Sequence, residues 1–405
     1  MTASPERSLG AALTRRRAIG AAAAAVAAPA MPPLWRTAAA QATPVSDDVP
    51  FPADLRLALE DVVDRGLAAT YTPGALVGVW LPGQAAWTKA AGIGNLETAA
   101  PVTLDDHVRI ASNTKTFVAT VVLQLVDEGA LSLDDTLEQH IPGVANGNEI
   151  TLRQVLGMTA GIHDFVSDPR VAVDYANDPL LPFSPEEALA IIRNAPADFA
   201  PGERVQYSNS NYTLLGLIAE QATGGSIEAE IERRIIVPLG LSGTSFPTTP
   251  DMPEPFMHGY TAEAPGDPLV DVTRSNPAVP WASGAMISTL ADLRTWAEAL
   301  ALGTLVSFDM QQERVQFTMS PVPNLEFGYG LGILTVNGLV GHNGGIAGYN
   351  SWVMYDPVTS ITVVVVTNRA TEQGGTADPV FFGICQLLFP DRFPMQAQPA
   401  ATPAA

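Results

Sequence analysis

Residues 109–117 read RIASNTKTF and place Ser112 three positions before Lys115. Lysine is scarce in this chain, which has Lys89 and Lys115 as its two lysines beside nineteen arginines. A buried lysine can lose its proton and act as a base, whereas arginine keeps its charge in proteins. Residues three apart share one face of a helix, so the pair sets a hydroxyl nucleophile beside an amine base. The alternative is an N-cap serine beside a lysine that extends to solvent.

An apolar helix is predicted to open at Ser112, within this stretch. Segment 108–110 has the composition of a strand, and apolar residues then recur at helical spacing. These residues are Phe117, Val118, Val121, Val122, Leu125 and Val126. Gly129 is a typical C-terminal stop, and the apolar surface predicts a central, buried helix. The partial positive charge of a helix N-terminus would stabilise an alkoxide or oxyanion at Ser112.

A second polar element, residues 205–211 (VQYSNSN), precedes a helix predicted from Leu214 to Ala222. Alternate residues of an extended chain share a face, so Tyr207 and Asn209 are expected to point the same way. A tyrosine near a cationic lysine is expected to have a lowered pKa and to transfer protons. An asparagine amide can bond both the lysine and a substrate carbonyl. The alternative is an ordinary polar turn.

A third element, residues 341–349 (GHNGGIAGY), lies between two predicted strands. Glycines here permit a ligand to approach the strand edge closely. The backbone N–H of Gly345 is a candidate to form an oxyanion hole with that of Ser112. His342 is a candidate acid or electrostatic partner. The alternative is a glycine-rich hairpin that carries a solvated histidine.

Strand signals occur at both ends of the chain and helical signals in its middle. The predicted strands are 75–80, 85–89, 329–336, 339–342, 349–355 and 361–367, and the predicted terminal helices are 54–63, 290–302 and 379–388. This order predicts an α+β fold with one antiparallel sheet flanked by helices, plus an inserted, mainly helical lobe. The α/β lobe is expected at about 54–111 and 285–390 and the helical lobe at about 112–284. A cleft between the lobes is the natural place for a site.

The bulk composition excludes several classes of function. The 405-residue chain has a formal net charge of −21, which argues against a nucleic-acid partner. Its hydrophobic fraction of 47% is too high for a disordered chain. The single cysteine, Cys385, rules out an intrachain disulfide and is expected in the core.

The three polar elements occur in the order Ser-x-x-Lys, Tyr-x-Asn and His-x-Gly. This order resembles the active-site set of the penicillin-recognising serine hydrolases, the β-lactamase-related superfamily. Within it, the chain is most similar to class C β-lactamases and to secreted D-alanyl-D-alanine carboxypeptidases of the peptidase S12 type. The resemblance spans roughly residues 54–390 and includes 123–129, 207–212, 328–332 and 342–349.

The resemblance implies a mechanism with an acyl-serine intermediate at Ser112, followed by hydrolysis, with no metal and no cofactor. Lys115 and Tyr207 would share the proton transfers. Asn209 would position Lys115 and the substrate amide, and His342 would lie beside the leaving group. The resemblance also implies an oxyanion hole from Ser112 and Gly345, and substrate contacts from Asn209, Asn343, Gly344 and Gly345.

The chain departs from relatives that bind a free carboxylate. Those relatives usually carry hydroxyl residues where this chain has Asn343 and Gly345, and segment 332–337 lacks the arginine with which the carboxypeptidases hold the carboxylate. The first hypothesis is therefore a D-amino-acid peptidase, carboxypeptidase or amidase, the second a carboxylesterase and the third a class C-like β-lactamase. Each predicts a small-molecule or peptide substrate, such as a peptidoglycan stem peptide or an ester. A hypothesis of another class is a non-catalytic peptidoglycan-binding protein.

The N-terminus has the features of a twin-arginine export signal. Basic residues at 15–17 precede an apolar run at 18–30 and small residues at 40–42. That run is short for a membrane span, so no stable span is expected after signal cleavage, and the protein is expected in the periplasm, the cell wall or the medium. The predicted organisation is an export signal at 1–42, a linker at 43–53, a serine hydrolase domain at 54–390 and a disordered tail at 391–405.

Overall fold

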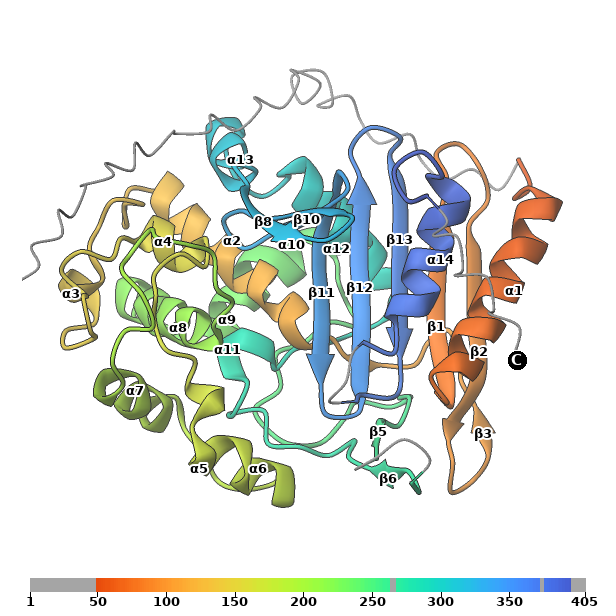
Figure 1. Ribbon diagram of the computed structural model, residues 1–405, viewed down its shortest axis with the longest axis horizontal. Coiled ribbons are helices and arrows are strands. Elements are labelled where there is room, and N and C mark those ends of the chain that lie inside the picture. Colours follow the sequence, from red (N-terminus) through yellow and green to blue (C-terminus); the bar gives the residue numbers. More distant parts are fainter. Residues whose placement is uncertain (1–48, 263–266, 372–374, 395–405) are drawn as a thin grey trace, which may run out of the picture.

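The computed structural model describes residues 49–262, 267–371 and 375–394. The predicted export signal lies outside the described residues, as does the predicted tail from residue 395 onwards. The predicted α+β fold is confirmed, with a large antiparallel sheet and helices on both of its faces (Figure 1).

The sheet has nine strands in the order β3-β2-β1-β13-β12-β11-β10-β9-β8. Two distant segments, residues 74–101 and 318–367, build it and meet where β1 pairs with β13. Its strands are β1 (Gly74–Trp80), β2 (Trp87–Asn95), β3 (Ala100–Pro101), β8 (Thr318–Val322), β9 (Leu325–Tyr329), β10 (Leu334–Val336), β11 (Leu339–Ile346), β12 (Tyr349–Asp356) and β13 (Ile361–Thr367). Every residue of β1 is buried, as expected for a strand covered on both faces.

Three helices cover the sheet: α1 (Ala53–Ala69), α12 (Leu290–Leu302) and α14 (Asp378–Leu388). α1 and α14 pack against each other on one face, while α12 lies against β1, β12 and β13 on the other (Figure 1). α12 has the bounds predicted from the sequence, because the Thr289 side chain accepts a hydrogen bond from a backbone N–H of its first turn. The predicted burial of Cys385, in α14, is also confirmed.

The middle of the chain is mainly helical and packs beside β11. Its central elements are α2 (Thr114–Asp127), α8 (Asn209–Thr223) and α11 (Trp281–Gly284), which contact one another. The other helices are α3 (Leu137–His140), α4 (Leu152–Leu156), α5 (Pro169–Ala172), α6 (Asp174–Asn177), α7 (Pro185–Asn194), α9 (Ile227–Ile231), α10 (Val237–Leu239) and α13 (Phe308–Arg314). Short elements are the 3₁₀ turns η2 (Ala111–Asn113) and η3 (Phe165–Ser167), the π turn η4 (Glu232–Ile236), and the strand pairs β4 (Val108–Arg109) with β7 (Ile287–Ser288) and β5 (Tyr260–Thr261) with β6 (Val270–Asp271).

Several predicted elements differ from the structure. The helix predicted from Leu214 begins at Asn209, and the strand predicted at 85–89 runs from Trp87 to Asn95. The strand predicted at 329–336 is interrupted, because Gly332 has a φ of 75° and the backbone turns between β9 and β10. Ser112 was predicted to open α2, but it lies in the separate turn η2 immediately before that helix. Within the described ranges, no helix combines the length and the apolar surface needed to cross a membrane.

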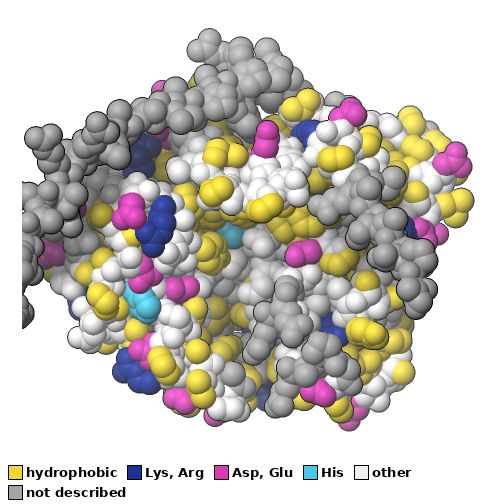
Figure 2. Space-filling model, in the orientation of Figure 1, with side chains coloured by type: hydrophobic (Ala, Val, Ile, Leu, Met, Phe, Trp, Pro, Cys, Tyr) yellow, Lys and Arg dark blue, Asp and Glu magenta, His cyan; other side chains and the backbone are white. Residues whose placement is uncertain are grey.

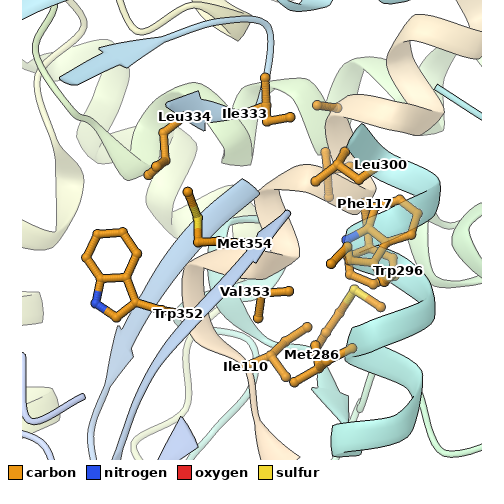
Figure 3. Close-up of a cluster of buried hydrophobic side chains, with 14 of the residues drawn as sticks. Ile110, Phe117, Met286, Trp296, Leu300, Ile333, Leu334, Trp352, Val353 and Met354 are labelled. Atoms are coloured by element: carbon orange, nitrogen blue, oxygen red, sulfur yellow. The ribbon is translucent and has the colours of Figure 1, made fainter. Parts of the chain in front are cut away.

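An aromatic stack anchors α2 to the layer that covers the sheet. The rings of Phe117 and Trp296 are stacked with centroids 3.9 Å apart, and the Trp296 Nε1–H donates to Thr116 Oγ1 over 2.8 Å. Figure 3 shows this pair beside Val353 of β12 in one continuous apolar core. Because cores pack densely, α2 cannot shift relative to the sheet without opening a void. This rigidity fixes the position of the turn at its N-terminal end.

Candidate active site

A tight turn positions Ser112 between β4 and α2. Ala111, the residue before it, has a φ of 50°, a value that residues other than glycine rarely adopt. The Asn113 side chain holds the turn by donating to the Ile110 carbonyl over 3.1 Å and to Ser351 Oγ over 3.0 Å. The turn lies so close to β11 that a Cβ at Gly344 would overlap the Ile110 carbonyl oxygen. Gly344 therefore permits the approach of η2 to the sheet.

Lys115 is fully buried one turn after Ser112. Its Nζ lies 3.2 Å from Ser112 Oγ, 2.8 Å from Asn209 Oδ1 and 2.7 Å from the Ser283 carbonyl oxygen. The amide oxygen and the carbonyl oxygen can only accept, so they take two N–H bonds of the lysine. A neutral amine then has its lone pair left for the Ser112 hydroxyl proton. The sequence prediction that the pair shares one face is confirmed.

Burial sets the charge of this lysine. Removal from water lowers the pKa of Lys115 from 10.5 to about 7, and the negative charge of Asp164 partly opposes this shift. A pKa near 7 means that both the ammonium and the free amine are populated at neutral pH. Lys115 can therefore accept a proton from Ser112 and release it again.

Tyr207 completes the contacts of the Ser112 hydroxyl. Its hydroxyl donates to Ser112 Oγ over 2.7 Å, and Lys115 Nζ lies 4.8 Å from the centroid of its ring. The prediction of a lowered pKa is wrong, because burial of the hydroxyl raises the pKa of Tyr207 above its usual value of 10. The residue as a whole is 42% exposed, whereas the surroundings of its hydroxyl are buried. Tyr207 is thus a neutral phenol that can donate a proton.

Asn209 joins Lys115 to a residue that sequence reasoning missed. It begins α8, accepts from Lys115 through Oδ1 and donates through Nδ2 to Asp164 Oδ2 over 3.0 Å. The predicted bond between Asn209 and Lys115 is confirmed. Asp164 lies in the stretch GIHDF (161–165), where a single acidic residue before an apolar one gave no signal of a partner more than forty residues away.

His342 is buried within β11, so the solvated-histidine alternative is wrong. Its Nε2 lies 3.0 Å from the Tyr329 hydroxyl and its Nδ1 lies 2.5 Å from the Asn343 carbonyl oxygen. That carbonyl can only accept, so Nδ1 carries the proton and Nε2 accepts from Tyr329. Burial lowers the pKa of His342 to about 3, and the nearby Lys115 adds to the effect. A neutral ring whose nitrogens are both occupied does not support the predicted role as an acid.

A cavity of about 400 Å³ opens beside the Ser112 hydroxyl. Ser112, Asn209 and Gly345 line it together with mostly apolar residues: Val166, Val171, Ala172, Tyr175, Pro179, Val272, Val279, Pro280, Ile346 and Ala347. Figure 2 shows a hollowed face of the molecule with apolar side chains around the hollow. The predicted contact residues Asn343 and Gly344 are not among the residues that line this cavity.

Gly345 and Ser112, the two residues predicted to form an oxyanion hole, both line the cavity. β11 turns into β12 with Ile346 paired to Tyr349, so the backbone groups of Ile346 and Gly344 face β12. Those of Gly345, between them, face away from β12, along the part of β11 that extends beyond its pairing with β10 and that packs against η2. The backbone N–H groups of these two residues are therefore candidates to stabilise an oxyanion in the cavity.

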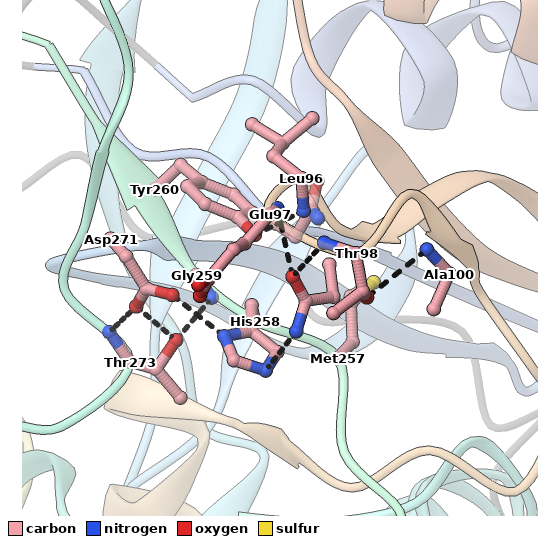
Figure 4. A network of polar contacts seen from close by, with 12 residues as sticks. Leu96, Glu97, Thr98, Ala100, Met257, His258, Gly259, Tyr260, Asp271 and Thr273 are labelled. Carbon is pink, nitrogen blue, oxygen red and sulfur yellow. Dashed lines mark hydrogen bonds and ion pairs between the residues drawn. The ribbon is translucent and has the colours of Figure 1, made fainter.

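A polar network holds the wall of the cavity that includes Val272. His258 Nδ1 lies 2.6 Å from Asp271 Oδ2, and the Tyr260 hydroxyl accepts from the Leu96 N–H over 2.7 Å (Figure 4). The Thr273 hydroxyl donates to Asp271 Oδ1 over 2.6 Å. These contacts join residues 257–262 and 267–273 to each other and to the turn after β2, so this wall is held in place within the described residues.

The chain is similar to several proteins of known structure or known name. The solved structure of a D-stereospecific amidohydrolase from Streptomyces sp. matches with a TM-score of 0.72 and 32% identity, covering 85% of this chain and 99% of that one. A D-amino acid amidase from Ochrobactrum anthropi SV3 matches with a TM-score of 0.73 and 25% identity, over 83% and 98%. Esterase EstB from Burkholderia gladioli is 31% identical over 206 residues, 48% of this chain and 52% of its own.

These neighbours share the β-lactamase fold that the structure shows. The model of the Beta-lactamase family matches residues 59–381, and the chain belongs to that family. The predicted resemblance to the β-lactamase-related superfamily is thereby confirmed. Other curated relatives align over 331 residues at 28% identity, and the chain spans 64% of their length.

Proposed function

We propose that this protein is an exported serine hydrolase that cleaves amides or esters of D-amino acids through an acyl-Ser112 intermediate. The observation that carries the proposal is the position of Ser112 Oγ, which lies between Lys115 Nζ and the Tyr207 hydroxyl and opens on an apolar cavity. A nucleophile, a base and a proton donor within hydrogen-bond reach are what acyl transfer requires.

The first half-reaction forms the ester bond to Ser112. The neutral Lys115 amine takes the hydroxyl proton as Ser112 Oγ attacks the substrate carbonyl carbon. The carbonyl oxygen becomes an oxyanion that the N–H groups of Ser112 and Gly345 stabilise. Tyr207 gives its proton to the departing amine or alcohol, and the Lys115 ammonium, which holds the proton taken from Ser112, returns one to Tyr207. In the second half-reaction, water replaces the leaving group and the same protons move in reverse.

The lining of the cavity favours a substrate that has an apolar side chain and an uncharged leaving group. Among the described residues that line it, none is arginine or lysine, so a terminal carboxylate has no cationic partner there. This favours amidase or aminopeptidase action over release of a C-terminal D-alanine. The two structural neighbours named for D-stereospecific amide hydrolysis support the same choice. The match to Esterase EstB supports ester cleavage as the second candidate.

Export is proposed from residues 15–42 alone, since their order of basic, apolar and small residues is that of a twin-arginine signal. The proposed partners are small amides, peptides or esters met outside the cytoplasm. A fusion of residues 1–48 to a reporter, with Arg15 and Arg16 replaced by lysine as control, tests the route. Reporter that stays inside the cell with the native signal contradicts export.

We expect the purified protein to hydrolyse D-phenylalanine amide at least about tenfold faster than L-phenylalanine amide. The reason is that a substrate bound in a rigid cavity fits with one configuration at its α-carbon better than with the other. Release of phenylalanine is measured by chromatography, with p-nitrophenyl butyrate and an acyl-D-Ala-D-Ala peptide in parallel. Ester cleavage without amide cleavage would favour the esterase. If D-alanine were released from the peptide faster than phenylalanine from its amide, the cavity would bind a terminal carboxylate without an arginine or lysine, against our expectation. Absence of hydrolysis of all these substrates would favour the hypothesis of a non-catalytic binding protein.

The pH dependence of kcat/KM should report Lys115. Below pH 7 its amine is protonated and cannot accept the Ser112 proton, so kcat/KM should fall about tenfold per pH unit on the acid side. The limb should have an apparent pKa of about 7, the value that burial sets for Lys115. His342 should add no limb near neutrality, because its pKa is about 3. A profile that is flat between pH 5 and 8 would contradict the base role of Lys115.

A further inference from the structure

Asp164 contacts the active site without belonging to any of its three sequence motifs. It is half-buried at the start of η3, where Oδ1 accepts from the Val166 N–H over 3.4 Å and Oδ2 accepts from Asn209 Nδ2 over 3.0 Å. The next residue of α8, Ser210, holds the flanks of this turn. Its hydroxyl donates to the His163 carbonyl over 2.6 Å and accepts from the Phe165 N–H over 2.9 Å. The first turn of α8 and the turn at Asp164 therefore form one locked unit.

This contact decides which way the Asn209 amide points. A carboxylate only accepts, so Asn209 must turn its NH₂ group to Asp164 and consequently its oxygen to Lys115. The opposite orientation would set an NH₂ group against the lysine amine, with donor facing donor. Since an amide can flip about its terminal torsion, the acceptor seen by Lys115 depends on Asp164. The second N–H of Asn209 stays free for the cavity that this residue lines.

Asp164 also supplies negative charge to the neighbourhood of Lys115. The charged or titratable groups around the Lys115 amine are Asp164, the phenols of Tyr207 and Tyr212, and the imidazole of His342. Burial keeps the two phenols neutral by raising their pKa values and keeps the imidazole neutral by lowering its pKa. Asp164 is thus the group that opposes the loss of the lysine proton caused by burial.

We propose that Asp164 is a positioning residue for acyl transfer, which orients Asn209 toward Lys115 and keeps that lysine able both to take and to release a proton. The inference rests on the proposed function of the same site. The structural alternative is that Asp164 only caps η3 through the Val166 N–H. Loss of a cap lowers stability but does not change the protonation of a lysine elsewhere, so the two explanations differ in the pH profile.

The test compares Asp164→Asn and Asp164→Ala with the wild type, by kcat/KM for p-nitrophenyl butyrate between pH 5 and 9. The Asn variant removes the charge and keeps an acceptor, so the acid limb should move down by roughly one pH unit. The Ala variant also removes the acceptor for Asn209, so kcat/KM at its optimum should fall by on the order of tenfold. Thermal unfolding is recorded for each variant, and should the Ala variant fail to fold, the isosteric Asn variant still decides.

Asp168→Asn is the matched control. Asp168 caps α5 in the same segment, accepting from the Arg170 N–H over 2.9 Å and pairing with the Arg170 guanidinium, and it makes no contact with Asn209. The acid limb of the kcat/KM profile of Asp168→Asn should stay at the pH of the wild-type limb. The inference is overturned if the limb of Asp164→Asn does not move, or if Asp168→Asn moves it equally. An inactive wild type would instead overturn the proposed function, whereas an active, Ser112-dependent enzyme with an unmoved limb overturns this inference alone.

Discussion

Ser112→Ala is expected to lower kcat/KM by on the order of ten-thousandfold or more, on amides and esters alike, because residues that act as one catalytic unit fail together when the nucleophile is lost. The protein should stay folded, since only one oxygen is removed and Lys115 keeps its bonds to Asn209 and the Ser283 carbonyl. Initial rates at enzyme concentrations high enough to detect residual turnover measure the loss, beside a thermal melt.

Ser226→Ala is the control for this variant. Ser226 caps α9 by accepting from the Ala229 N–H over 3.3 Å and does not line the cavity. Its removal should cost about 1 kcal/mol of stability at most and leave kcat/KM near that of the wild type. Turnover in Ser112→Ala within tenfold of the wild type would refute the nucleophile assignment.

Lys115→Arg is expected to be nearly as inactive as Ser112→Ala. Arginine cannot give up its proton in a protein, so the variant keeps a positive charge but has no free base for the Ser112 proton. Its larger, planar head must also fit where Lys115 Nζ contacts three oxygen atoms. The activity of this variant is measured across pH 5–10. An arginine variant that turns over with the wild-type pH profile would rule out a base role for Lys115.

Lys115→Met separates the catalytic loss from the stability of the fold. In the folded protein the pKa of Lys115 is lowered from 10.5 to about 7, so between these pH values the unfolded chain binds the extra proton. The buried lysine therefore lowers the free energy of unfolding of the wild type more and more as the pH falls from 10.5 to 7. Below pH 7 it lowers that free energy by a constant amount. The free energy of unfolding of the Met variant, relative to wild type, should rise by about 1.4 kcal/mol for each unit that the pH falls across this window. A difference that is independent of pH would show that Lys115 titrates normally.

Short-range patterns in the sequence predicted several elements closely. The Thr289 cap and the apolar spacing after it predicted α12 with its observed bounds. The spacing of Ser112 and Lys115 predicted their contact, since adjacent helical turns superpose such residues whatever surrounds them. The interrupted strand before β10 was not predicted, because a positive φ at Gly332 is one of several conformations open to glycine.

Properties that depend on tertiary contacts could not be predicted in this way. The raised pKa of Tyr207 and the buried, neutral state of His342 follow from the packing of α2, α8 and β11 around one amine. The bond from Asn209 to Asp164 joins α8 to a turn that nothing in the sequence pairs with it. Likewise, Gly344 was expected to contact substrate, whereas its place against Ile110 is visible only when η2 and the sheet are both present.

The central claim is that Ser112 becomes acylated. The most direct test is acid quenching of the enzyme within milliseconds of mixing with p-nitrophenyl butyrate, followed by intact-mass spectrometry and peptide mapping. We expect a mass increase of one butyryl group, located on the peptide that contains Ser112, and no such increase in Ser112→Ala. An acyl group on another residue, or full ester turnover in a Ser112→Ala protein that carries no acyl group, would contradict it.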